Sequence, residues 1–121
     1  MKKLILAVLL LIAAACTPTG GTQQSPQAIA QTTLQGVESA YQAAAQAELV
    51  YMRLPTCGTP AATTALCATA ERRKQIKDYD MQAYAAIVAA RAAADAASPA
   101  LPAAVTAADS SVKTLSNSIP K

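Results

Sequence analysis

Three cysteines, Cys16, Cys57 and Cys67, carry the most reactive side chains of this chain of 121 residues. A thiol can act as a nucleophile, bind a metal, pair in a disulfide or carry a lipid. Histidine, the usual general base and the commonest metal ligand, is absent from the sequence. The seven acidic residues are scattered, and Asp78 and Asp80 project to different sides of a helix. We therefore expect no enzyme activity, no metal site and no cofactor.

The residues before Cys16 have the pattern of an export signal. A basic start, Met1-Lys2-Lys3, is followed by twelve apolar residues, 4–15, which are too few to span a bilayer. Residues 1–15 are therefore predicted to be a signal peptide. Ala13-Ala14-Ala15-Cys16 resembles the lipobox of bacterial lipoproteins, although that family usually has Leu where this chain has Ala13. Cleavage by ordinary signal peptidase, which would leave Cys16 as a free thiol, is the alternative.

The lipobox resemblance implies that Cys16 becomes the first mature residue and carries acyl chains. The membrane would then be a partner through this lipid, because two or more acyl chains anchor a protein stably. Thr17, in place of Asp, implies a location on the outer membrane, facing the periplasm. Residues 17–27 are rich in Gly, Pro and Thr, so residues 16–27 are predicted to form the lipidated cysteine and a flexible tether.

If Cys16 carries lipid, the other two cysteines remain in an oxidising compartment, ten positions apart. A disulfide between Cys57 and Cys67 would close the turn around Pro55 and Gly58. The alternative is a redox-active pair, but such cysteines usually lie two residues apart and have a group nearby that lowers the pKa of a thiol. We therefore expect a structural disulfide.

Apolar residues recur at steps of three and four in three segments: 28–54, 68–97 and 98 or 101–119. No strand-like alternation is present, and the fold class predicted for residues 28–121 is all-α. We expect an antiparallel three-helix bundle, in which a long helical hairpin with a disulfide-stapled turn is joined by a shorter third helix. The apolar surface of the second segment is widened by Met81, Tyr84 and Val88, on which we expect the third helix to pack.

Alanine dominates the apolar composition, since 31 of the 121 residues are Ala. Alanine favours helix but buries little apolar area, so the core is expected to be thin and the alanine faces would let the two long helices approach closely. The same near-heptad faces could also build a homo-oligomer. Glu48 and Asp80 lie on these apolar stripes, where each is expected to reach solvent or to pair with Arg53 or Arg91.

The densest charge lies at Arg72, Arg73, Lys74 and Lys77, which we identify as candidate interaction residues. A solvated helix face is the alternative, because the net charge of +3 falls to +1 once Lys2 and Lys3 are removed with the signal peptide. Four basic residues without interleaved aromatic residues do not indicate nucleic acid as a partner.

The lipobox, the short tether and the stretch Leu54-Pro55-Thr56-Cys57-Gly58 together resemble small lipoproteins of phages and prophages of Gram-negative bacteria. This resemblance implies a role in lysis or in superinfection exclusion. The function expected first is that of a non-catalytic, lipid-anchored helical module that binds an envelope protein. A phage lysis or superinfection-exclusion lipoprotein, and a general structural envelope lipoprotein, are the alternatives.

Overall fold

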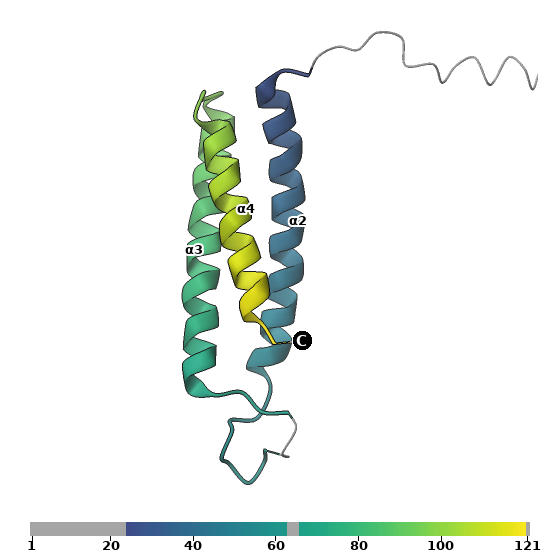
Figure 1. The fold of residues 1–121 in the computed structure, drawn as a ribbon, viewed down its shortest axis with the longest axis vertical. Coiled ribbons are helices and arrows are strands. Elements are labelled where there is room, and N and C mark those ends of the chain that lie inside the picture. The colour runs from purple at the N-terminus through teal and green to yellow at the C-terminus, as the bar shows by residue number, and fades with distance from the viewer. Residues whose placement is uncertain (1–23, 63–65, 121) are drawn as a thin grey trace, which may run out of the picture.

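Three helices account for most of the chain in the computed structural model, which describes residues 24–62 and 66–120: α2 (Pro26–Met52), α3 (Ala70–Asp95) and α4 (Leu101–Ser118) (Figure 1). Over those two ranges no strand is formed, and one isolated bridge joins Thr56 to Ala68. The predicted all-α, three-helix fold is confirmed. The predicted signal peptide and Cys16 lie outside the described residues.

The first helix begins at Pro26, whereas the tether was predicted to extend to residue 27. The side chain of Ser25 accepts a hydrogen bond from the backbone N–H of Ala28, and Pro26 occupies the first helical position. Both are start signals, because a serine cap satisfies a free N–H and proline lacks the N–H that would otherwise be unpaired. Pro26 and Gln27, assigned to the tether, therefore belong to α2.

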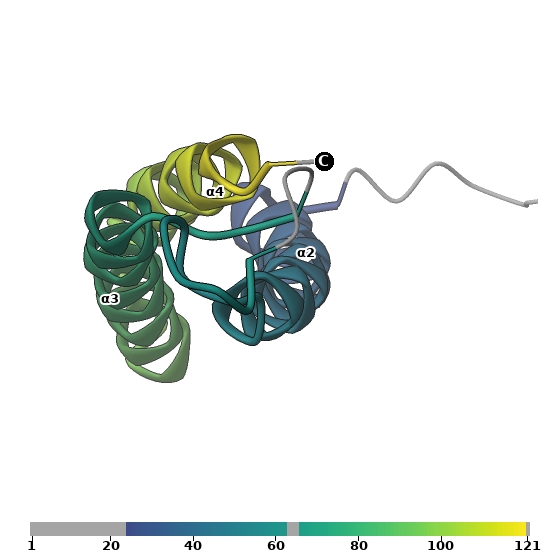
Figure 2. The ribbon, with the colours of Figure 1, turned by 90° about the horizontal axis from the view of Figure 1, so that it is seen from below.

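The helices run alternately up and down, so that α2 and α4 are both antiparallel to α3 (Figure 1). Seen along the bundle, they stand at the corners of a triangle (Figure 2). Contact is most extensive between α3 and α4 and least extensive between α2 and α3. Helix α4 packs against both long helices and supplies most of the contact that holds them, whereas the two long helices contact each other least.

The core follows the predicted stripes closely. In α4 every apolar residue of the stripe is buried, and the list is Leu101, Val105, Ala108, Val112, Leu115 and the adjoining Ile119. The buried residues of α2 and α3 are Ala30, Leu34, Val37, Ala44, Tyr51, Ile76, Ala83, Ile87 and Ala90. The large side chains that are fully buried in the described ranges are Ile76, Leu101 and Leu115. The core is thin, as the alanine content predicted.

One predicted contact of α3 does not form. Met81, Tyr84 and Val88 are 62%, 56% and 44% exposed, so α4 does not cover them. The side of α3 that is buried in the core carries Ala83, Ala90 and the half-buried Ala86 instead, and α4 is the main neighbour of α3. The small side chains of that side allow a close approach between helices, which the bulkier side would prevent.

The two ends of the bundle are built differently. The start of α2 and the short connection 96–100 lie at one end, and the described parts of the long connection, residues 53–62 and 66–69, lie at the other (Figure 1). The 27 residues of α2 separate these ends by about 40 Å. The end that leads back toward Cys16 is thus far from the end that holds the other two cysteines.

Candidate functional site: the stapled end

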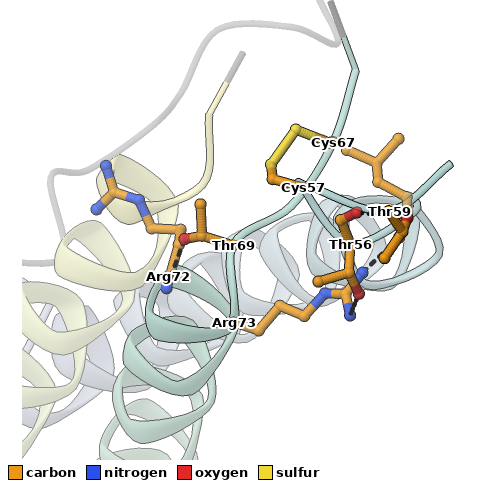
Figure 3. Close-up of a disulfide and its surroundings, with 8 residues drawn as sticks. Thr56, Cys57, Thr59, Cys67, Thr69, Arg72 and Arg73 are labelled. Atoms are coloured by element: carbon orange, nitrogen blue, oxygen red, sulfur yellow. Dashed lines mark hydrogen bonds between the residues drawn. A yellow bond between two sulfur atoms is a disulfide. The ribbon is translucent and has the colours of Figure 1, made fainter. Parts of the chain in front are cut away.

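We call residues 53–62 and 66–79 the stapled end, because a disulfide joins Cys57 to Cys67 there (Figure 3). The two Cα atoms lie 4.9 Å apart, which is within the usual range for a disulfide. Two backbone hydrogen bonds flank the link: Cys57 donates to Ala68 at 3.1 Å, and Ala68 donates to Pro55 at 2.9 Å. Ala68 is fully buried. The predicted disulfide is confirmed.

The turn after Cys57 depends on a glycine. Gly58 has a φ of +84°, a backbone conformation that side chains disfavour. The turn is closed on Thr56, whose carbonyl accepts from both the backbone N–H and the hydroxyl of Thr59, at 3.3 and 2.7 Å. The first arm of the long connection is therefore ordered by local hydrogen bonds as well as by the disulfide.

Arg73 fastens this connection to α3. Its guanidinium donates to the carbonyl of Leu54 and, at 3.1 Å, to the hydroxyl of Thr56 (Figure 3). The Nε atom is buried without a hydrogen-bond partner, and the residue as a whole is half-buried. Arg73 was predicted as one of four interaction residues, but its guanidinium is committed to the connection. The half-buried position of Arg73 could have been predicted from the sequence. Arg73 lies three residues before Ile76 and so continues the stripe that contains Ile76 and Asp80.

The other predicted residues point along different sides of α3. Thr69 caps the helix by accepting from the N–H of Arg72 at 3.2 Å. The Arg72 side chain donates to Gln75 at 2.8 Å, and Gln75 donates to the hydroxyl of Tyr79 at 3.3 Å. These three side chains, which we call the polar ladder, help to line an open hollow of about 660 Å³.

Lys74 and Lys77 line a second hollow, of about 520 Å³, together with Arg73 and Met52, and Lys74 also borders the first hollow. Lys74 forms an ion pair with Asp78 at 2.7 Å, one helical turn further on. Surface pairs of this kind contribute at most a few tenths of a kcal/mol. Three of the four predicted residues, Arg73, Lys74 and Lys77, therefore border one hollow, in which Arg73 is bound to the connection, while Arg72 borders the other hollow with Lys74.

Polar contacts also join α2 to α3 above the stapled end. The hydroxyl of Tyr41 donates to Asp80 at 2.8 Å, and Arg91 pairs with Glu38 at 2.5 Å. Burial, and then the bond to Asp80, raise the pKa of Tyr41 to about 12. Burial, followed by the charge of Asp80, raises the pKa of Glu48 above its ordinary value. Asp80 and Glu48 were each expected to reach solvent or to pair with Arg53 or Arg91. Asp80 and Arg91 do not pair with each other, because Asp80 accepts from Tyr41 and Arg91 pairs with Glu38.

These contacts hold helices together and provide neither a nucleophile with a base nor a cluster of ligands. Within residues 24–62 and 66–120, no group of cysteines and carboxylates could hold a metal ion. None of the three described helices is long and apolar enough to cross a membrane. No protein-family model, no curated protein and no solved structure matches this chain.

Proposed function

We propose that this protein is a non-catalytic, lipid-anchored helical module, held at the periplasmic face of the outer membrane, that binds an envelope protein through the stapled end. The observation that carries the proposal is the placement of the two ends. The start of α2, which the tether precedes, and the cross-linked connection lie about 40 Å apart along the bundle. A lipid at Cys16 would therefore leave the stapled end free to face a partner.

The construction of the stapled end suits it for binding. The disulfide, the two backbone hydrogen bonds beside it and the contacts of Arg73 fix its shape before a partner arrives. A surface that is already ordered loses little conformational entropy on association. The polar ladder of Arg72, Gln75 and Tyr79 provides donors and acceptors beside the hollow. We expect a partner with a complementary polar surface.

The anchor is tested by Cys16→Ala, exported through a cleavable signal peptide. We expect this variant to keep its helical circular dichroism and to lose both membrane association and the cellular phenotype of the parent. A Cys16→Ala protein that works as well as the parent would show that no lipid is needed. Release of cytoplasmic contents on induction, only together with an inner-membrane partner, would indicate a lysis factor instead.

The binding end is tested separately, with a photo-crosslinking residue placed in intact cells. Gln82, beside the polar ladder, is the test position, and Thr33, near the start of α2, is the matched exposed control. We expect a discrete crosslinked product at Gln82 that disappears when Arg72→Glu is added. Crosslinking that is equal at both positions, or that survives Arg72→Glu, would contradict binding through the stapled end.

A further inference from the structure

Six exposed residues of α3 form a continuous line beside its core stripe, along the edge next to α2. They follow one another at steps of four and three, and the list is Lys77, Met81, Tyr84, Val88, Arg91 and Asp95. We call this line the outer seam. Steps of four and three are the spacing of the a and d positions through which two helices pack along their length. The core stripe of α3 has the same spacing but lies on a different face.

The outer seam has an apolar middle and carries opposite charges at its two ends, with Arg91 next to Asp95. The central part is apolar, with Met81, Tyr84 and Val88 at 62%, 56% and 44% exposure. Lys77 lies seven residues before Tyr84, and Asp95 lies seven residues after Val88. The seam thus ends in a positive charge on one side and a negative charge on the other. Exposed apolar residues with such a charged border are typical of an association surface.

We propose that the outer seam joins two copies of this chain as an antiparallel pair of α3 helices. With the twofold axis midway between Tyr84 and Val88, Tyr84 of one copy packs against Val88 of the other, and Lys77 lies opposite Asp95. In this register each a position meets a d position, as antiparallel helix packing requires. A parallel pair would instead place Lys77 against Lys77 and Asp95 against Asp95, which is repulsive.

The remaining pair of this register brings Met81 opposite Arg91. The guanidinium of Arg91 is held to the side by Glu38 of α2, at 2.5 Å, so the aliphatic part of Arg91 is left to cover Met81 of the second copy. Tyr84 is likewise supported from α2, since its ring lies 6.4 Å from that of Tyr41. Helix α2 thus orients two residues of the seam before the second copy binds.

The length of the seam sets the expected strength. From Lys77 to Asp95 it runs for about 27 Å. A single pair of helices of this length buries an area near the lower limit for a specific interface. Ala85 and Ala92, exposed beside the seam, allow the helices to approach closely. We therefore expect a reversible dimer with a dissociation constant of roughly 10–100 μM, which crowding of anchored copies in one membrane would favour.

Sedimentation velocity of the full chain tests the proposal, with Cys16→Ala added so that no lipid drives association. We expect a concentration-dependent shift from one chain to two between about 5 and 500 μM. Val88→Glu should abolish this shift. The matched control is Val50→Glu on α2, which replaces another exposed valine, 66% accessible, and should leave the shift unchanged. Circular dichroism of each variant shows that the helices remain folded.

A charge reversal tests the direction of pairing. Asp95→Lys places a cation at the end of α3, where it favours the helix, but opposes it to Lys77 of the second copy. We expect the dissociation constant to rise about tenfold, and the double variant Lys77→Glu with Asp95→Lys to restore it. A chain that stays monomeric throughout, a dimer that tolerates Val88→Glu, or a double variant that remains weakened would each overturn the proposal.

Discussion

The two connections of this bundle reverse the chain by different means. The short connection, residues 96–100, is closed mainly by the backbone: Ala97 donates to Ala94 at 3.0 Å and Ser98 donates to Ala93 at 2.9 Å. Two single side-chain bonds add to it, from Gln27 to the carbonyl of Ala97 and from the N–H of Ala100 to the hydroxyl of Ser98. The pair of backbone bonds is the Schellman ending of a helix, and it requires the positive φ of 48° at Ala97. The long connection, residues 53–69, adds a disulfide and the side chain of Arg73.

The difference follows from chain length. A short reversal loses little conformational entropy on folding, and the unpaired carbonyls of the preceding helix supply its hydrogen bonds. A long reversal has more freedom to lose, and the last carbonyls of α2 accept only from its first residues, Arg53 and Leu54. Its order depends on links between residues that are far apart in sequence, and here Cys57–Cys67 and Arg73–Leu54 provide them. The stability of the long connection should therefore respond to side-chain changes much more than that of the short one.

The largest expected effect comes from removing the disulfide. Cys57→Ser with Cys67→Ser should lower the free energy of unfolding by about 2.5–3 kcal/mol, because the unfolded chain regains the freedom of a ten-residue loop. Urea unfolding followed by circular dichroism measures this change. Pro99→Ala in the short connection is the control and should change stability by less than about 0.5 kcal/mol. Equal losses of unfolding free energy in the two variants would show that the two connections depend on their side chains to the same extent.

The next effect concerns Arg73. Arg73→Met keeps the aliphatic stem but removes the bonds to Leu54 and Thr56, and we expect a loss of about 1–2 kcal/mol. Arg72→Met is the matched control, because the exposed side chain of Arg72 bonds only to Gln75 of its own helix among the described residues. A change below about 0.5 kcal/mol is expected. A similar loss for both arginines would show that Arg73 does not fasten the connection.

In the short connection one substitution should stabilise the protein. Ala97→Gly relieves the positive φ and should raise the free energy of unfolding by about 0.5–1 kcal/mol, after allowance for the extra freedom of glycine in the unfolded chain. Ala43→Gly, on the exposed face of α2, should instead lower stability by about 1 kcal/mol. If Ala97→Gly were as damaging as Ala43→Gly, strain at the short connection would be disproved.

The smallest expected effect is a pH-dependent change in stability at Glu48, which lies where α2 approaches the long connection. The pKa of Glu48 is raised in the folded protein, so folding is disfavoured by its negative charge at every pH above that value. Glu48→Gln should therefore be slightly more stable than the parent at pH 7. The advantage should shrink as the pH falls through the folded-state pKa and vanish below the ordinary value of 4.5.

The control for this pH dependence is Glu71→Gln. Glu71 lies in the first turn of α3, where a negative charge is favourable, so its removal should lower stability slightly at pH 7. Unfolding curves recorded between pH 3 and pH 7 compare the two variants with the parent. An advantage of Glu48→Gln that persists at pH 3 would rule out the charge of Glu48 as its cause.

The sequence predicted best what depends on a single helix. The stripe of α4 is strongly amphipathic and packs against both other helices, so its spacing alone identified Leu101, Val105 and the rest of its buried face. The disulfide was predicted by counting the cysteines and assuming that the chain is exported. Local spacing and composition were sufficient in both cases.

The sequence did not predict the contacts for which one helix offers two similar faces to its neighbour. Met81, Tyr84 and Val88 offered an apolar surface to α4, and the alanine side of α3 offered another. Spacing cannot rank two such faces, because the closeness of helix packing decides between them. The same holds for Arg73, whose partners Leu54 and Thr56 come from another element, and for the pairing of Arg91 with Glu38.

The alanine-filled core has a consequence for how this protein responds to temperature. Unfolding exposes little apolar surface per residue when so few large side chains are buried, and apolar exposure is what gives unfolding its positive heat capacity change. A small heat capacity change flattens the curve of stability against temperature, since the enthalpy and entropy of unfolding then vary slowly. The bundle should thus keep a nearly constant, modest stability from cold to warm conditions.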